Sequence, residues 1–409
     1  MMFTINRKIK VVIMFLGLFI SVSFAGESES IITGNNEFAF NLYSQIKNLP
    51  DIKQDEGNLF FSPYSISTAL AMTYIGARGN TAKEMAQVLE LPSLKLEQIA
   101  SAFGELQNSL QADKETSGYQ LNVANALWGQ KGYGFLPDFL DINKKYFGSG
   151  LTEVDFEQHE QARQIINTWV ENQTQEKIKD LLPPGIFDDD LTRLVLTNAI
   201  YFKGFWETQF KTENTKPAKF NVTTDKTVDV QMMFQKGKYS YGEDDEMQLL
   251  SLPYKGNELS MFIILPKKID SFDSVEQKVI KNNLPITALR AQEVGVYLPK
   301  FKITCGTINL KDTLKAMGMK DAFSDSSDFS GMNGRRDLYI SQVFHKAFVE
   351  INEEGTEAAA STAVVIKLKS VSLPTPVFRA DRPFIFMIKD NASQSILFIG
   401  KVCNPTIEG

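Results

Sequence analysis

The chain has 409 residues, 43% of them hydrophobic, which is enough apolar sequence to bury a large core. No proline-, glycine- or serine-rich linker, repeat or low-complexity block divides it, so we expect one domain over residues 26–409. The formal net charge is −6 and the basic residues form no dense cluster. This balance argues against nucleic-acid binding and against a heparin site.

The first 25 residues are typical of a secretory signal peptide. Basic residues at positions 7, 8 and 10 precede an apolar run over 11–20, and small residues end at Ala25. The run is too short to span a bilayer. We therefore expect residues 1–25 to be removed and the mature protein, starting near Gly26, to have no membrane attachment. The expected location is extracellular, or periplasmic if the source is bacterial.

Two features depend on that export. Cys305 and Cys403 each lie beside a strand-like run, where buried thiols are common, although an exported protein could also pair them. The sequence leaves both states open. Three N-glycosylation sequons begin at Asn172, Asn221 and Asn391, and they matter only if the source glycosylates.

The first elements are a helix and a short strand that leads into a second helix. Apolar residues recur at helical spacing over 36–49, and 59–61 is a short apolar strand. Ser62 is expected to cap the following helix. Pro63 stands at its first position, where the missing N–H costs little.

The middle of the chain alternates helices and strands. Thr81 and Glu84 have capping-box spacing and predict the start of the next helix. Residues 121–128 read as a strand and 161–182 as a helix. Residues 194–202 are apolar on both faces apart from one threonine and one asparagine, which predicts a central strand.

Strands dominate the C-terminal half. They are expected over 259–265 and 294–303, and a closing hairpin is expected from 384–388 and 396–402. A short helix near 310–317 lies between them. The mixture predicts an α+β protein.

The stretch 353–369 combines a turn signal with a strand signal. Two glutamates and Gly355 indicate a turn. With period two, one face then carries small, uncharged and increasingly apolar side chains: Thr356, Ala358, Ala360, Thr362, Val364 and Ile366. Such a face suits a strand that inserts between two existing strands, since bulky groups would clash and a charge would be buried unpaired. The alternative interpretations are an alanine-rich helix and a linker.

A catalytic site would have few residues to use. Only two histidines exist, His159 in a polar stretch and His345 in an apolar run, and we interpret them as a surface residue and a structural residue. No GxSxG, HExxH or P-loop motif is present. The acidic residues 243–246 are interpreted as a solvated turn. We therefore expect no enzyme activity, no metal and no cofactor.

Four blocks of the chain closely resemble the serpin family of serine protease inhibitors. They are NLFFSPYSISTALAMTYIGARGNTAKEMAQVL at 58–89, LVLTNAIYFKGFWETQF at 194–210, FHKAFVEINEEGTEAAAST at 344–362, and FRADRPFIFMI with SILFIGKVCNP within 378–405. The resemblance covers residues 36–405. It implies an α+β serpin fold of three β-sheets and about nine helices, with an exposed reactive-centre loop at about 353–378.

The resemblance also assigns roles to residues. It implies that a hinge starts the loop: Glu353, Glu354, Gly355, Thr356, Glu357, Ala358, Ala359, Ala360, Ser361 and Thr362. It implies that a shutter lies beneath the central sheet: Ser62, Pro63, Ser65, Asn198 and His345. Trp206 matches the tryptophan of the breach, where the loop first inserts. Inhibitory serpins keep the hinge small, so these residues favour an inhibitor.

The implied mechanism is suicide inhibition. The protease serine attacks the loop and forms an acyl-enzyme, and the freed loop inserts into the central sheet. The family spacing places the reactive bond fourteen residues after Gly355, between Lys369 and Ser370, which suits a trypsin-like protease. The rival bonds are Lys367–Leu368 and Leu368–Lys369; cleavage after Leu368 would suit an elastase- or chymotrypsin-like protease.

The expected partner is therefore a serine protease, held in a covalent acyl complex by a monomeric inhibitor that can also form loop–sheet polymers. The alternatives are a non-inhibitory serpin, acting as a carrier, chaperone or storage protein, and an inhibitor of cysteine proteases.

Overall fold

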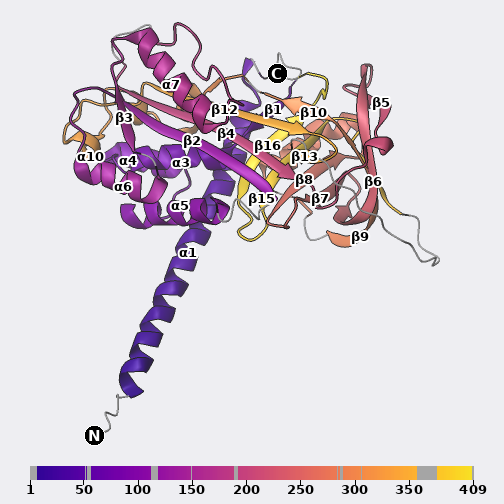
Figure 1. Cartoon of the computed structure of the whole chain (residues 1–409), viewed down its shortest axis with the longest axis horizontal. Coiled ribbons are helices and arrows are strands. Elements are labelled where there is room, and N and C mark those ends of the chain that lie inside the picture. Colours follow the sequence, from indigo (N-terminus) through magenta and orange to yellow (C-terminus); the bar gives the residue numbers. More distant parts are fainter. Residues whose placement is uncertain are drawn as a thin grey trace.

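The computed structural model describes residues 7–50, 52, 57–111, 118–148, 150–187, 192–282, 284–285, 289–304, 306–356 and 375–407, with side chains from residue 26 onward. The expected α+β class is confirmed (Figure 1). Nine α-helices lie in this described part of the chain: α1 (Arg7–Ile46), α3 (Pro63–Tyr74), α4 (Gly79–Val88), α5 (Leu96–Gln111), α6 (Pro137–Phe147), α7 (His159–Gln173), α8 (Phe272–Ile280), α9 (Lys311–Met317) and α10 (Ser330–Asn333).

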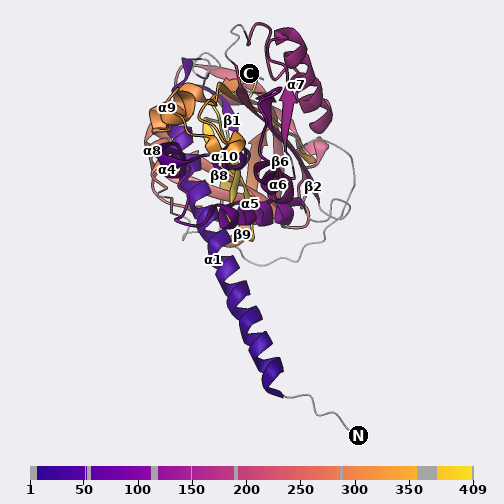
Figure 2. The ribbon, with the colours of Figure 1, turned by 90° about the vertical axis from the view of Figure 1, so that its left-hand side faces the viewer.

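Helix α1 begins in the expected leader and ends in the body of the protein. Its N-terminal half projects away from the rest of the molecule, as Figures 1 and 2 show. The helix is continuous through Ala25. Removal of residues 1–25 stays a prediction. None of the helices in the described ranges is both long and apolar enough to cross a membrane.

The central sheet has the strand order β10-β12-β4-β2-β3, with β11 beside β12 and β13 beside β4. Its strands are β2 (Tyr119–Gln130), β3 (Leu151–Val154), β4 (Leu194–Phe205), β10 (Phe301–Ile303), β11 (Ile308–Asn309), β12 (Gln342–Ile351) and β13 (Gly355–Thr356). Strands β2, β4 and β12 lie side by side across the middle of the molecule (Figure 1). The expected strand over 194–202 is therefore central.

Both faces of β4 are covered, as predicted from a sequence that over 194–202 is apolar on both faces apart from Thr197 and Asn198. Leu196 and Ile200 belong to the main core, which includes residues of α3. Val195 and Ala199 point to the other face and join a second core with the inner side of α7. The sheet therefore lies between helices, and a new strand would be buried on both faces.

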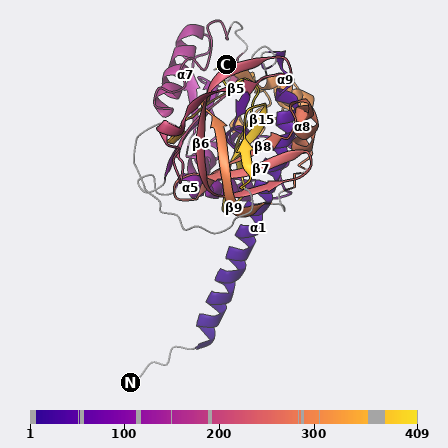
Figure 3. The same cartoon turned by 90° about the vertical axis from the view of Figure 1, so that its right-hand side faces the viewer.

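The remaining strands form a second sheet of order β1-β16-β15-β8-β7-β6-β9-β14, with β5 beside β6 (Figure 3). They are β1 (Leu59–Phe61), β5 (Lys216–Asn221), β6 (Thr227–Glu243), β7 (Met247–Pro253), β8 (Leu259–Pro266), β9 (Arg290–Pro299), β14 (Val377–Arg379), β15 (Phe384–Asp390) and β16 (Ile396–Val402). The second and third expected sheets are continuous, because the 17-residue β6 pairs with β9 over most of its length and with β7 at its end. The closing hairpin β15–β16 is confirmed.

Two capping predictions have different outcomes. Ser62 caps α3, its side chain accepting from the Ser65 N–H, and Pro63 is the first helical residue. The capping box of Thr81 and Glu84 is wrong, because α4 already begins at Gly79. The Thr81 hydroxyl instead accepts from the Asp328 N–H at 2.9 Å, so a tertiary contact uses the group that local spacing assigned to the helix.

Candidate functional site: a strand position that is partly filled

The parallel pairing of β4 and β12 ends part-way along the central sheet. Residues 195–201 pair with 342–348. Beyond that point β13 lies beside β4 in the antiparallel direction, with Thr356 opposite Gly204 and Gly355 opposite Phe205. The chain that follows β12 has therefore turned back and begun a strand next to β4. In Figure 1 this end of the sheet faces β6, β7 and β8.

A tight turn reverses the chain between β12 and β13. The Asn352 N–H donates to the Gly355 carbonyl at 2.9 Å, and the Gly355 N–H donates back to the Asn352 carbonyl at 3.3 Å. The Asn352 side-chain oxygen also accepts from the Glu354 N–H at 3.1 Å. The Asn352 side chain thus stabilises the turn by accepting a hydrogen bond from the backbone two residues on, as asparagine commonly does in turns.

Gly355 has no room for a side chain. A Cβ at this position would lie 2.0 Å from the Gly204 carbonyl oxygen and 2.7 Å from the Cα of Phe205. Its φ of +145° is also a conformation that L side chains rarely adopt. The close approach of β13 to β4 therefore requires glycine here.

Trp206 fastens this turn to β4. Its backbone N–H donates to the Glu354 carbonyl at 2.8 Å, and its indole N–H donates to the Asn352 carbonyl at 3.0 Å. The indole stacks on Tyr254 with ring centroids 4.8 Å apart. The residue matched to the breach therefore contacts the start of the hinge directly.

Glu353 anchors the same turn by charge. One carboxylate oxygen lies 2.9 Å from the Lys300 ammonium, and the other accepts from the Thr215 hydroxyl at 2.8 Å. Burial alone would raise the pKa of this carboxyl, but the hydrogen bonds from Lys300 and Thr215 outweigh it and lower the pKa. Glu353 is therefore ionised at neutral pH.

Thr356 is already in an interior position. Its side chain is fully buried, and its hydroxyl lies 3.3 Å from the hydroxyl of Tyr254. This agrees with its predicted place on the inner face of the strand. A charged side chain here would be buried without a partner.

Four of the residues matched to the shutter meet where β4 and β12 contact the start of α3. Ser62, Ser65, Asn198 and His345 are buried and joined by hydrogen bonds, and Pro63 is buried beside them in the first turn of α3. Asn198 and His345 face each other in the parallel register of β4 and β12. The cluster therefore ties α3 to both strands between which a new strand would have to pass.

Asn125 completes this shutter cluster and was not predicted. Its side-chain oxygen accepts from the Ser65 hydroxyl at 3.0 Å and from the Asn198 amide, and its amide donates to the Ser65 carbonyl at 3.2 Å. A polar residue inside the apolar run 121–128 was the available signal. The contacts of Thr215, Tyr254, Lys300 and Asn352 with the hinge were likewise not predicted.

His345 is held as a neutral imidazole. The Ser62 N–H donates to Nε2 at 3.2 Å, so the ring proton is on Nδ1, which donates to the Asn198 side-chain oxygen. Burial lowers the pKa of His345 to about 3. Because the ring and the serines around it are fully buried, no substrate can reach them, which agrees with the structural interpretation of this histidine. His159, the other histidine, is half-buried at the first residue of α7.

The rest of the predicted loop lies outside the described residues. This applies to Glu357, Ala358, Ala359, Ala360, Ser361 and Thr362 of the hinge, to Lys369 and Ser370 of the reactive bond, and to Cys305. The described chain resumes at residue 375, just before β14.

Comparison with known proteins identifies the family. The sequence profile of the family described as Serpin (serine protease inhibitor) matches residues 33–405. The chain belongs to the serpin family. It is 42% identical over 391 residues to leukocyte elastase inhibitor A of Rattus norvegicus, a match that covers 92% of this chain and 100% of that one.

Solved serpin structures have the same fold. Serpin48 of the insect Tenebrio molitor superposes with a TM-score of 0.82 at 34% identity, covering 92% of this chain and 98% of that one. Human thyroxine-binding globulin superposes with a TM-score of 0.80 at 33% identity, covering 93% and 98%. One is described as a highly specific serpin and the other by the ligand it binds, so the fold alone does not decide between protease inhibition and small-molecule binding.

Proposed function

We propose that this serpin is a suicide inhibitor of serine proteases. The observation that carries the proposal is β13: the first two residues of the loop already pair with β4, and Thr356 is already buried in the central sheet. The uncut chain thus already contains the first two residues of a new strand beside β4. Cleavage of the loop would free the residues that follow to extend this strand. A carrier would have no need of a hinge whose one face, from Thr356 to Ile366, carries only small or apolar uncharged side chains.

The chemical step belongs to the protease. Its serine Oγ forms an ester with the carbonyl carbon of Lys369, the peptide bond to Ser370 breaks, and the Ser370 nitrogen leaves as a free amine. The released loop then inserts between β4 and β12 and carries the acylated protease with it. Insertion therefore has to outrun hydrolysis of the ester.

The inserting residues supply the driving force. Each ladder hydrogen bond contributes roughly 0.5–1.5 kcal/mol net. Burial of Val364 and Ile366 would add about 1.5–3 kcal/mol apiece. Over about a dozen residues this exceeds the stability of a typical domain, so the uncut state is kinetically trapped.

The proposed reactive bond is Lys369–Ser370, and the proposed target is a trypsin-like protease. Lysine before the bond matches an acidic specificity pocket. A second candidate has a specific observation in its favour, because the matched relatives include leukocyte elastase inhibitors. If the bond were Leu368–Lys369, the target would be elastase- or chymotrypsin-like.

The deciding experiment is incubation with trypsin and, separately, with elastase, followed by denaturing gel electrophoresis. We expect trypsin to give a band that survives denaturation at the summed mass of inhibitor and protease. Sequencing the released C-terminal peptide should begin at Ser370. A peptide that begins at Lys369, with a complex formed only by elastase, would instead establish the second candidate.

Variants of the loop separate binding from trapping. Lys369→Leu should abolish the complex with trypsin, whereas a full yield of complex would refute the assignment of this bond. Thr356→Arg should still be cut but should release active trypsin, because the buried position cannot accept an unpaired charge. Thr356→Ser is the matched control and should keep the complex.

We also propose that the protein is exported by its leader, residues 1–25. The proposal rests on the basic, apolar and small-residue order of that segment. The match to the family profile covers residues 33–405 and so does not include this segment. N-terminal sequencing of protein secreted by a eukaryotic host should begin near Gly26; protein retained in the cell with residue 1 intact would refute the proposal.

A further inference from the structure

The three sequons differ in what their side-chain amides do in the folded protein. N-glycosylation joins a sugar to the amide nitrogen of asparagine and replaces one of its two hydrogens. An asparagine whose amide hydrogens both make buried or half-buried hydrogen bonds therefore loses structure when it is modified. One with an exposed amide and no such bonds loses nothing.

Asn391 uses both amide hydrogens. Its Nδ2 donates to the Asn257 carbonyl at 2.8 Å and to the Ser260 hydroxyl at 2.9 Å. Its backbone N–H also donates to the Glu258 carbonyl at 2.8 Å. The side chain joins the β15–β16 turn to the start of β8, and a glycan would break this joint.

Asn221 is intermediate. Its Nδ2 donates to the Asp381 carbonyl at 3.0 Å, and its backbone N–H donates to the same oxygen at 2.8 Å. The residue is half-buried at the end of β5. One amide hydrogen of Asn221 is therefore hydrogen-bonded, and its acceptor, Asp381, belongs to the segment that follows β14.

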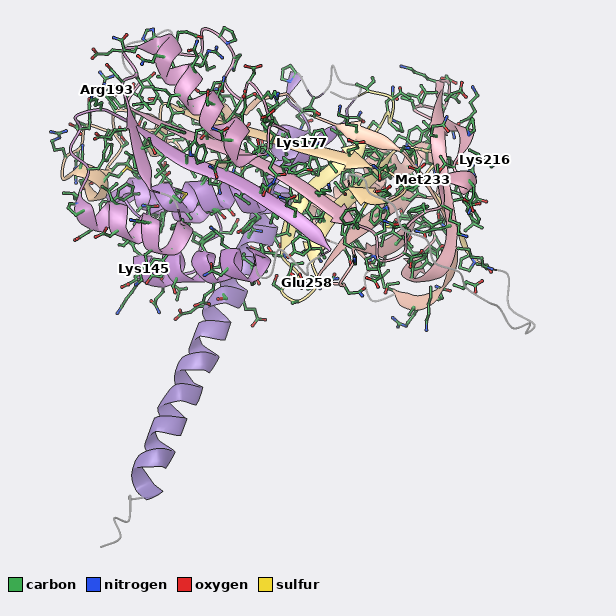
Figure 4. The ribbon with its side chains drawn as sticks, viewed as in Figure 1. Lys145, Lys177, Arg193, Lys216, Met233 and Glu258 are labelled. Carbon is green, nitrogen blue, oxygen red and sulfur yellow. The ribbon has the colours of Figure 1, made fainter. Side chains whose placement is uncertain are left out.

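Asn172 is exposed, and within the described residues its side chain makes no hydrogen bond. It stands one residue before the end of α7. The inner side of this helix, with Ile166 and Val170, packs on the central sheet, so Asn172 faces away from it. Figure 4 shows Lys177, just past α7, over the strands, where its ammonium lies 5.8 Å from the centre of the Tyr201 ring.

A shallow, open groove runs along the outer face of α7 beside Asn172. It has a volume of about 410 Å³ and is lined by Asn172 itself with Gln161, Gln164, Ile165, Thr168 and Trp169, so its apolar part is formed by Ile165 and Trp169. Ile165 is 45% exposed and is one of three large hydrophobic side chains that are exposed in the described part of the chain. Trp169 is held in place by an edge-on contact with Trp128, their ring centroids 5.5 Å apart. Residues 165, 169 and 172 share one face because they are spaced four and three apart.

We propose that Asn172 is the N-glycosylation site of this protein, and that the first sugars of the glycan cover Ile165 and Trp169. The proposal rests on the proposed export. In the step itself, a lipid-pyrophosphate-linked oligosaccharide transfers its sugar to Nδ2. The N–C1 bond forms, the C1–O bond to the pyrophosphate breaks, Nδ2 loses a proton, and the lipid pyrophosphate leaves. The sugar then lies over apolar side chains that would otherwise face water.

The sequon must be read before the helix folds. Thr174, its third residue, is fully buried, and its hydroxyl donates to the Val170 carbonyl at 2.8 Å and accepts from the Ile178 N–H at 3.3 Å. Folding therefore hides the hydroxyl that the transferase requires. It also makes Thr174→Ala a poor test, because that change removes structural bonds along with the sequon.

The experiment uses the full chain secreted from a eukaryotic host, with Asn172→Gln, Asn221→Gln and Asn391→Gln as single variants. Treatment with an amidase that removes N-glycans, followed by mass spectrometry of peptides, should find the modification at Asn172 in the folded protein. On a denaturing gel the Asn172→Gln variant should run faster by the mass of one N-glycan. The Thr174→Ser variant, which keeps the sequon, should run like the wild-type protein. An unmodified Asn172 in secreted protein, or a glycan carried by Asn391 in the folded fraction, would overturn the proposal.

Two further measurements separate this proposal from the others. In the first, residues 1–25 of the same variants are replaced by a signal peptide of proven function. This tests glycosylation of Asn172 even if residues 1–25 do not direct export. The Asn172→Gln protein should bind more of an apolar fluorescent dye than the glycosylated protein, and a second change, Ile165→Ser, should reduce that binding. If the Asn172→Gln protein and the glycosylated protein bound the dye equally, the glycan would not cover the groove. Trypsin trapping should be unchanged by the glycan on Asn172, by Asn172→Gln and by the added Ile165→Ser, because these changes lie on the side of α7 away from the sheet.

Discussion

At the scale of single residues, the shutter cluster depends on the protonation state of one ring. His345 accepts from the Ser62 N–H through Nε2, so a second ring proton would point at a donor. The side chains of Asn198, Asn125 and Ser65 continue the network on the other side, and none of them is a carboxylate that could stabilise the imidazolium. Burial in this neutral surrounding explains why the pKa falls to about 3.

This predicts a loss of stability in mild acid. Because the pKa is lower in the folded than in the unfolded chain, where it is about 6.5, the unfolded state binds the proton first. Stability therefore falls as the pH drops from about 6.5 toward 3. Between pH 7.0 and 5.5 the loss should be about 1 kcal/mol, measured from urea-induced unfolding. The His345→Gln variant should be less stable at every pH but should lack this slope; an equal slope in both proteins would contradict the assignment.

At the scale of elements, β13 has only two residues, but the turn before it fixes its position. The turn from Asn352 to Gly355 positions it, and Trp206 and Lys300 hold that turn from two sides. Gly355 lets it approach Gly204. The first two residues of the strand are thus paired before any bond is cut. In the proposed mechanism this would shorten the insertion that has to finish before the acyl-enzyme is hydrolysed.

Gly355→Ala should therefore undock β13. The added methyl would meet the Gly204 carbonyl at 2.0 Å, so Thr356 would leave its buried position. We expect a loss of about 2 kcal/mol in stability and a change from trapping to simple cleavage by the target protease. Gly306→Ala is the control, since a Cβ there has nothing within 4 Å. A normal yield of complex from the Gly355 variant would show that the docked start is not needed.

At the scale of the whole molecule, a buried ion cluster joins three parts of the chain. Glu276 of α8 is 4% exposed and contacts Lys47, Lys401 and the Tyr43 hydroxyl at 2.5, 3.3 and 2.8 Å. It connects α1 and the turn after it to β16, which lies under the shutter cluster. Burial would raise the pKa of Glu276, but the two lysines and Tyr43 outweigh it and lower the pKa.

Glu276→Gln should destabilise the protein by roughly 3 kcal/mol, because it leaves two lysines near each other without their counter-charge. The midpoint of urea-induced unfolding at pH 7 measures this. Glu97→Gln, which removes the exposed partner of Lys145, is the matched control and should change stability by less than about 1 kcal/mol. Equal effects of the two variants would mean that the buried cluster has no special role.

The proposed kinetic trapping of the uncut chain gives a further prediction. Once the loop is cut, insertion should raise the melting temperature by on the order of 20 °C, given about a dozen new ladder bonds. A differential scanning measurement before and after cleavage tests this. Cut Thr356→Arg protein should show little of the increase. If cut wild-type protein melts where the intact protein does, the loop does not insert and the carrier alternative gains support.

The sequence by itself determined the elements whose signals are local. The apolar run of β4, the Ser62–Pro63 start of α3, the β15–β16 hairpin and the turn at Gly355 were all predicted, because periodicity, capping and turn chemistry act within a few residues. The resemblance to serpins placed Ser62, Asn198, His345 and Trp206 in roles whose geometry the structure now describes.

The tertiary structure decided which groups became partners. Ser62 and His345 are 283 positions apart, and Lys300 and Thr215 reach Glu353 from separate elements, so no local pattern contains these contacts. The same cause made the Thr81 capping box wrong, since Asp328 claimed its hydroxyl. The tertiary structure also distinguishes the three sequons. They are alike in sequence, but the folded chain surrounds each asparagine amide differently. Hydrogen bonds and burial depend on distance in space, and only the folded chain sets that distance.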